Sequence, residues 1–145
     1  MACSLPAFNA EIAYFYDGDT VKIKEDLYEY KLRLTDIDAP ERNQDYGKKS
    51  RRALMQFCQN AIINVYISGT DKYHRQLGKL KCNQNDASEF MITNGHAWFN
   101  KRYSMDYKLD LAEQNAKKQK LGLWERENAM PPWQWRKSHP REMLK

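Results

Sequence analysis

Apolar and polar residues alternate along the first third of the chain, and this period of two predicts short β-strands. The alternation covers residues 7–16 and 21–25, and it returns from Tyr28 through residues 33–37. The Asp17-Gly18 pair between the first two segments is typical of a tight hairpin turn. Three short strands with tight connections predict an antiparallel, strongly curled sheet.

The middle of the chain changes to a helical period and back. Apolar residues at helical spacing predict a helix over residues 46–61. Alternation then predicts a fourth strand over residues 62–68 and a fifth over residues 77–82. One helix is therefore expected between the third and the fourth strand.

Two further helices are expected after the fifth strand. Asp86 or Ser88 can cap a short helix that runs through Ile92 and ends at Asn94-Gly95. Ser104 is the expected cap of a longer helix over residues 105–120, which ends before Gly122.

These elements favour an α+β chain that is mainly β, a five-stranded Greek-key barrel of the OB type with three α-helices. Such barrels commonly bind nucleic acid on one face. The 145 residues suffice for one domain with a real core. We expect that domain over residues 7–125, after a disordered segment at 1–6 and before a basic tail containing Trp and Pro at 126–145.

The net charge of +5 favours a polyanionic partner such as nucleic acid, and it fits a merely basic soluble surface equally well. No apolar run approaches membrane-spanning length, and the sequence as given shows no signal peptide. Composition therefore predicts no membrane span and leaves the partner open.

The three cysteines and three histidines do not predict a zinc site, because no CxxC pair exists and the histidines are scattered. Cys58 and Cys82 would form a disulfide in an exported protein, or would be two buried thiols. Both alternatives remain open from the sequence. Cys3 is a candidate lipid attachment point if an upstream signal has been removed.

The stretch from Arg33 to Glu41 carries the first candidate chemistry. Arg33 lies on the third strand, and Asp38 and Glu41 follow where Pro40 ends it. Carboxylates bind a hard divalent metal ion, and a guanidinium binds a phosphate bidentately. Metal-assisted hydrolysis of a phosphodiester is therefore one interpretation, and a solvated loop is the other.

The hairpin Asp17-Gly18-Asp19 adds a second carboxylate, since the neighbouring strand can bring Asp19 beside Asp38. Two carboxylates with a backbone carbonyl and waters would suit Ca²⁺, and Mg²⁺ less well because it demands stricter geometry. Glu41 would act as a general base on the attacking water. A plain hairpin turn is the alternative for the first motif.

The polar cluster from Asp71 to Arg75 is the third candidate. Arg75 would be a second guanidinium on the phosphate, where transition-state charge gathers, with Lys72 and Tyr73 reaching flanking phosphates. An ordinary polar loop is the alternative. Tyr103 is a candidate for stacking on a base. We expect His96 to be structural.

Together these motifs resemble the staphylococcal nuclease (thermonuclease) family. The resemblance runs over residues 7–124 and keeps the order and spacing of the motifs Asp17-Gly-Asp19-Thr-Val, Arg33-Leu-x-x-Ile-Asp38-Ala-Pro-Glu41, Tyr46-Gly47, Asp71-x-Tyr-x-Arg75 and Gly95-x-Ala-Trp98. Any one motif is weak evidence, and five in order are strong.

The resemblance implies Ca²⁺-dependent hydrolysis of DNA and RNA that leaves 3′-phosphate ends. It implies Ca²⁺ ligation by the side chains of Asp19 and Asp38 and by the backbone carbonyl of Ala39. It also implies the roles of the remaining site residues: Glu41 as general base, Arg33 and Arg75 as phosphate ligands that stabilise the transition state, and Lys72, Tyr73 and Tyr103 as nucleotide contacts.

We expect a monomer that is secreted or periplasmic, whose export signal is absent from this sequence, acting on single-stranded or unstructured nucleic acid. A catalytically silent OB-fold module that binds nucleic acid is the alternative, and a basic protein-interaction domain is a third interpretation. One departure from the family stands next to a catalytic residue: His74 replaces the usual Gly before Arg75. If that position needs a positive φ, His74 could misplace Arg75.

Overall fold

The computed structural model of the chain describes residues 10–140. The predicted segment 1–6, Cys3 and residues 141–145 lie outside the described residues.

Within residues 10–140 the main sheet has six strands, five of them in the order β1-β2-β3-β6-β5. Neighbouring strands are antiparallel except β3 and β6, which run parallel. The sixth, the short strand β7, pairs with β6 in antiparallel orientation, and β4 and β8 form a separate two-stranded sheet. The bounds are β1 (Ala10–Phe15), β2 (Thr20–Glu25), β3 (Tyr28–Leu34), β4 (Ile37–Asp38), β5 (Ile63–Thr70), β6 (Gln76–Cys82), β7 (Asn85–Asp86) and β8 (Trp98–Phe99).

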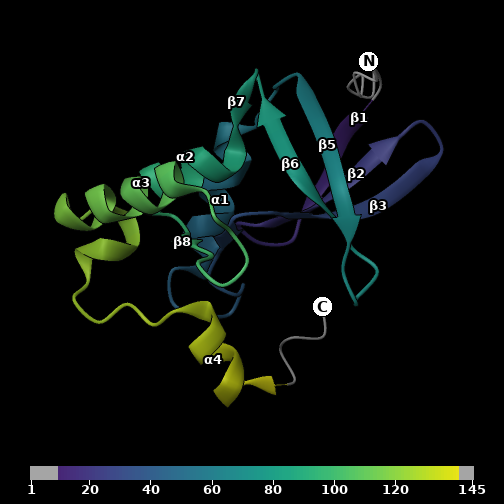
Figure 1. Cartoon of the computed structure of the whole chain (residues 1–145). Helices are drawn as coiled ribbons and strands as arrows, with labels where there is room; N and C mark the ends of the chain where they lie inside the picture. Colours follow the sequence, from purple (N-terminus) through teal and green to yellow (C-terminus); the bar gives the residue numbers. More distant parts are fainter. Residues whose placement is uncertain (1–9, 141–145) are drawn as a thin grey trace.

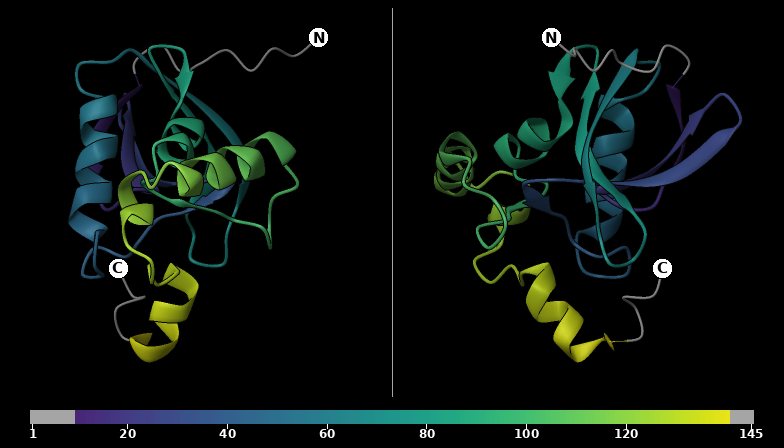
Figure 2. Two further views of the ribbon diagram at one scale, coloured as in Figure 1. Left: turned by 90° about the vertical axis from the view of Figure 1, so that its left-hand side faces the viewer. Right: turned by 45° about the vertical axis from the view of Figure 1, so that its right-hand side comes forward.

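The described part of the chain contains four α-helices, where three were expected. They are α1 (Gly47–Phe57), α2 (Ala87–Thr93), α3 (Tyr107–Lys118) and α4 (Pro132–Ser138), with one turn of 3₁₀-helix at Gly122–Glu125. Figure 1 and Figure 2 show α4 apart from the other helices, at the end of the molecule where the loop joining β5 and β6 also lies. The additional helix, α4, belongs to the predicted tail.

The predicted class, α+β and mainly β, is confirmed. Within the part of the chain that the structure describes, no ladder pairs β1 with β5, so hydrogen bonds do not close the sheet into a complete barrel. The three consecutive antiparallel strands that the sequence predicts are present as β1, β2 and β3. Such strands twist, and this twist curls the sheet.

The core is built from the apolar half of the alternating pattern. Val21 on β2 pairs with Leu32 on β3, and Ile23 and Leu34 belong to the same core cluster; all four side chains are fully buried. The fully buried Leu54 of α1 belongs to the same cluster, so the helix packs on the sheet through one face. Burial of this kind is the main stabilising term for a chain of this size.

The third strand ends earlier than predicted, at Leu34 rather than at Ile37. Asp36 has φ 73°, a left-handed conformation that breaks the ladder. The chain then re-enters extended structure as β4, where Ile37 pairs with Phe99 and Asp38 with Trp98. This break lets Asp38 leave the plane of the main sheet at a fixed place.

The predicted cap of the long helix is wrong. Asp106 caps α3, and its carboxylate accepts a hydrogen bond from the backbone N–H of Lys108. The hydroxyl of Ser104 instead donates to Asp36 and accepts from the backbone N–H of Asp106. Both residue types make good caps, so sequence alone does not distinguish them. For α2, the structure selects Asp86, which accepts from Ser88.

His96 is structural, as expected. Its Nδ1 lies 2.9 Å from the hydroxyl of Tyr46, which ties the segment after α2 to the start of α1. Burial lowers the pKa of His96, so the neutral ring is favoured in the folded protein.

Cys58 and Cys82 form a disulfide between the end of α1 and the end of β6. This settles the alternative that the sequence left open. The bridge joins residues 24 positions apart and lies within the buried core.

Replacing Cys58 and Cys82 together by Ser should lower the free energy of unfolding by about 3 kcal/mol, because the bridge restricts the unfolded chain. Urea denaturation with and without a reductant measures the loss. The reductant should lower the free energy of unfolding of the original protein to that of the double variant. It should leave the free energy of unfolding of the double variant unchanged. Equal stability of the oxidised and reduced protein would contradict the prediction.

Candidate active site

The Asp17-Gly18-Asp19 turn places one carboxylate against the segment that follows β4. The backbone N–H of Asp19 donates to Asp17 Oδ1 over 3.0 Å, which fixes the turn. Asp19 Oδ2 accepts from the backbone N–H of Ala39 over 2.7 Å. Gly18 is required by close packing, since a Cβ there would lie 2.1 Å from Ser50 Oγ. The turn is therefore a fixed support for Asp19 as well as a hairpin.

Arg33 joins three parts of the site from its place on β3. Its Nη2 lies 3.4 Å from Asp19 Oδ2 and 3.4 Å from Asp38 Oδ1. Its Nη1 donates to the carbonyl of Ile37 over 2.8 Å. Burial disfavours the charged guanidinium, but the carboxylates of Asp19 and Asp38 outweigh it and raise the pKa of Arg33.

Asp38 and Glu41 are both buried at the exit of β4, only 4% and 8% exposed. The backbone N–H of Glu41 donates to Gln44 Oε1 over 3.1 Å, which shapes the short loop after Pro40. Burial raises the pKa of Asp38, and the cations around that carboxylate oppose the increase. The two carboxylates are therefore buried. The sequence also allowed them to lie in a solvated loop, and the structure does not show that arrangement.

A residue that sequence analysis missed lies on these two carboxylates. Arg136, on α4, donates to Asp38 Oδ1 over 3.1 Å and to Asp38 Oδ2 over 2.8 Å. Its Nη1 also donates to Glu41 Oε1 over 3.0 Å. The only signal in the sequence was a cation in the aromatic tail, and nothing there indicated where the tail would pack.

Arg75 lies just before β6, the strand that pairs with β3, and outside the acidic cluster. The parallel pairing sets Leu32 opposite Gln76, so Arg75 precedes the paired segment directly. Its Nε donates to Asp71 Oδ2 over 2.8 Å, and its backbone N–H donates to Asp71 Oδ1 over 2.9 Å. Although burial acts in the opposite direction, these bonds lower the pKa of Asp71. The structure therefore orients Arg75 through Asp71.

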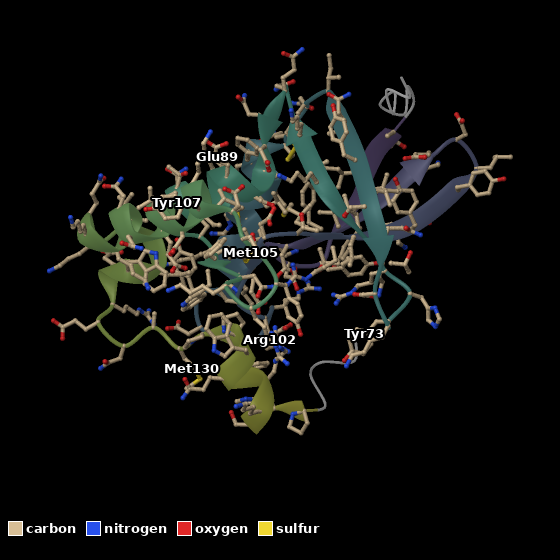
Figure 3. The ribbon with its side chains drawn as sticks, in the orientation of Figure 1. Tyr73, Glu89, Arg102, Met105, Tyr107 and Met130 are labelled. Atoms are coloured by element: carbon tan, nitrogen blue, oxygen red, sulfur yellow. A yellow bond between two sulfur atoms is a disulfide. The ribbon has the colours of Figure 1, made fainter. Side chains whose placement is uncertain are left out.

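The predicted nucleotide contacts lie on the exposed rim. Tyr73 is about half exposed, with Lys72 Nζ 5.3 Å and the Arg75 guanidinium 5.5 Å from its ring centre. Tyr103 is 76% exposed beside Arg102. Figure 3 shows Tyr73 and Arg102 at the end of the molecule where α4 lies. Cations and exposed rings are combined there, as in surfaces that bind single-stranded nucleic acid.

The donors at the site suit a hard cation. Asp19 and Asp38 offer carboxylate oxygens, and Arg33 and Arg136 are the cations that now neutralise them. Among residues 10–140, no group of three or more His, Cys, Asp or Glu side chains is arranged to hold a metal ion. A metal here would rely on two carboxylates completed by a backbone oxygen and water, as the sequence predicts.

Comparison with known proteins identifies the family. The model of the staphylococcal nuclease homologue family matches residues 31–126. The chain belongs to the staphylococcal nuclease homologue family. Its relatives include an uncharacterized endonuclease of Escherichia coli O157:H7, 34% identical over 121 residues that make up 83% of this chain and 79% of the relative.

Two further relatives carry nuclease names. A Haemophilus influenzae protein, also named an uncharacterized endonuclease, is 32% identical over 94% of this chain and 77% of its own length. A micrococcal nuclease of Shigella flexneri is 31% identical over 93% of this chain and 86% of its own length. The predicted resemblance is confirmed, and nuclease activity is indicated for this member of the family.

The family match has a boundary that matters for the site. Arg33, Asp38, Glu41 and Arg75 lie inside the matched residues, whereas α4 with Arg136 lies beyond them. The contact that covers the two carboxylates therefore comes from a part of the chain that the family model does not describe.

The loop that carries Arg75 contains the departure noted in the sequence. His74 has φ 65°, so the position does need a left-handed conformation. The loop is nevertheless closed, because His74 and Arg75 both bond to Asp71 through their backbone N–H groups. His74 is accommodated without loss of the Asp71–Arg75 ion pair.

Replacing His74 by Gly should raise the free energy of unfolding by about 0.5 kcal/mol. The left-handed conformation costs a non-Gly residue roughly 1–2 kcal/mol, and the larger freedom of unfolded Gly offsets roughly 0.5–1 kcal/mol of that gain. Urea denaturation measures the change. His74→Ala is the matched control, which retains the strain and should not stabilise. An Ala variant as stable as the Gly variant would contradict strain at this position.

Proposed function

We propose that this chain is a Ca²⁺-dependent nuclease that hydrolyses phosphodiester bonds of DNA and RNA and leaves 3′-phosphate ends. The observation that carries the proposal is one buried cluster that joins three segments of the chain. In it Arg33 on β3 links Asp19 of the first hairpin to Asp38 of β4, and Glu41 follows three residues after Asp38. Membership in the nuclease family supports the same activity.

The side chains of Asp19 and Asp38 and the backbone carbonyl of Ala39 would hold the cation. Bound Ca²⁺ would withdraw charge from a phosphate oxygen and orient the attacking water. One ion is sufficient for this site, and Mg²⁺ suits it less because it demands near-ideal octahedral geometry.

The protein groups would then divide the reaction between them. Glu41 Oε1 would accept a proton from the water as the water adds to phosphorus. The guanidinium of Arg33 would bind the phosphate oxygens, on which negative charge increases. The bond to the 5′ oxygen breaks, which leaves the phosphate on the 3′ side. Arg75, oriented by Asp71, would stabilise the departing oxygen.

The rim would position the chain of nucleotides. Tyr73 and Tyr103 are exposed and would stack on bases, and Lys72 would contact a flanking phosphate. Stacking on exposed rings requires bases that are not already paired, which favours single-stranded or unstructured DNA and RNA. We propose that the protein acts on them as a monomer.

The disulfide supports an oxidising location. Disulfides persist in secreted and periplasmic proteins and are rare in the cytosol. Among the described residues, no helix is both long and apolar enough to cross a bilayer. We propose secretion or export to the periplasm on the strength of the Cys58–Cys82 bridge.

A silent module that binds nucleic acid is the second candidate. The specific observation in its favour is the Arg136 guanidinium, which lies on Asp38 and Glu41 where a working site needs both carboxylates. Such a module would retain the basic rim and would show no turnover.

Hydrolysis of denatured DNA should require Ca²⁺, be slower with Mg²⁺ and stop with a chelator. The measurement follows release of acid-soluble nucleotides under the three conditions, at one ionic strength so that phosphate contacts remain comparable. Cleavage that survives the chelator would exclude the metal site. Salt-sensitive DNA binding without cleavage under any condition would support the silent module.

Replacing Glu41 by Gln should lower turnover by roughly 10²–10⁴-fold, because it removes the general base, while DNA binding persists. Single-turnover cleavage and DNA affinity are measured separately. Glu89→Gln on the exposed surface of α2 is the matched control, with the same loss of one negative charge, and should retain full activity. A loss of affinity as large as the loss of turnover would exclude the role of base.

A further inference from the structure

The contact between α4 and the acidic cluster uses the groups that the proposed reaction needs. Arg136 binds both carboxylate oxygens of Asp38 in a bidentate pair, at 3.1 and 2.8 Å. It also donates to Glu41 Oε1 at 3.0 Å. Asp38 is the proposed metal ligand and Glu41 the proposed base, so one guanidinium engages both functions at once.

The helix is docked on the domain by several other contacts. Gln44 Nε2 donates to the carbonyl of Met130 over 2.6 Å, just before the helix, and Arg126 pairs with Asp45. The ring of Trp133 meets Trp98 edge to face at 6.3 Å between centres. These contacts come from the loop after Glu41 and from β8, so they hold the segment beside the site.

The helix carries its own apolar anchors as well. Pro132 begins it, as Pro often does, and is buried. Trp135 is 9% exposed and stacks on His139 at 4.0 Å. Since apolar packing can seat α4 without a cation, a merely structural helix has no need for a guanidinium at this depth.

Charge explains why a guanidinium lies there. Asp19, Asp38 and Glu41 bring three buried carboxylates together, and Arg33 on β3 supplies one positive charge. Arg136 supplies a second, from α4. Its side chain is 23% exposed, so it reaches the cluster from the solvent side, the side from which an ion or a phosphate must also arrive.

We propose that Arg136 is an internal competitor of the divalent cation, and that α4 must leave the site before the cation and the nucleic acid bind. This inference rests on the proposed function, because it takes Asp38 as a metal ligand and Glu41 as the base. The chain is therefore autoinhibited by its own tail. The apparent affinity for Ca²⁺ equals the intrinsic affinity multiplied by the fraction of molecules in which α4 is undocked.

The nucleic acid can assist the opening. Once released from Asp38 and Glu41, the guanidinium of Arg136 is a ligand for phosphate, the other bidentate partner that suits its geometry. Substrate and cation would then stabilise the same open state, so each would favour binding of the other.

The test measures Ca²⁺ binding to the full chain by isothermal titration calorimetry, without substrate. Arg136→Ala should bind Ca²⁺ about tenfold more tightly if α4 is docked in about nine of ten molecules. Lys137→Ala is the matched control, since it removes an exposed positive charge from the same helix, and its affinity should stay that of the original protein. The two variants therefore separate the specific contact from general electrostatics.

Hydrogen exchange on the original protein gives a readout that needs no variant. Saturating Ca²⁺ should increase amide exchange at residues 133–138 of the original protein, because α4 leaves the site. Unchanged protection of α4 on addition of Ca²⁺ would overturn the inference.

The outcomes distinguish this inference from the proposed function. If the original protein binds Ca²⁺ and cleaves DNA, and Arg136→Ala binds the ion equally or more weakly, the competitor role is overturned and the nuclease stands. If neither protein binds Ca²⁺, the proposed metal site fails and the inference fails with it. If Lys137→Ala increases the affinity for Ca²⁺ as much as Arg136→Ala does, the loss of net positive charge explains the effect, and the inference is overturned.

Discussion

The ion pairs of Arg33 with Asp19 and Asp38 are the constraint on which the site depends. Each partner lies in a different segment, on β3, at the first hairpin and on β4, so the three can meet only when β2 and β3 are paired and the chain has turned at Asp36. Buried carboxylates are costly without cations. The fold and the site therefore support each other: the sheet brings the charges together, and their pairing fixes the exit of β3.

The same constraint explains the competition for the acidic cluster. Three buried carboxylates exceed the charge of Arg33 alone, and a further cation lowers the cost of burying them. A divalent ion and the guanidinium of Arg136 are two solutions to one electrostatic problem. They differ in what they leave available, because a bidentate guanidinium occupies both oxygens of Asp38, whereas a metal site retains water for the chemistry.

Much of the fold was predictable, because it depends on local pattern. The alternating segments, the Asp17-Gly18 turn and the helix after the third strand all appear where the sequence placed them, within a few residues. The break at Asp36 was not predictable, since Asp favours no single conformation and the left-handed turn is set by packing around it. The pairing of β4 with β8 joins residues about 60 positions apart, which no local pattern encodes.

Only the site residues that lie in recognisable sequence motifs were predictable. Asp19, Arg33, Asp38 and Glu41 lie together because each stands in a motif whose spacing is fixed by strands and turns. Arg136 has no such motif, and its position depends on how a Pro- and Trp-containing segment packs against Trp98 and the loop after Glu41. A short helix of this kind gains little from propensity and is held by tertiary contacts. The position of Arg136 at the site therefore follows only from the packing of α4. The weak intrinsic stability of this short helix also allows a cation and a polyanion to displace it.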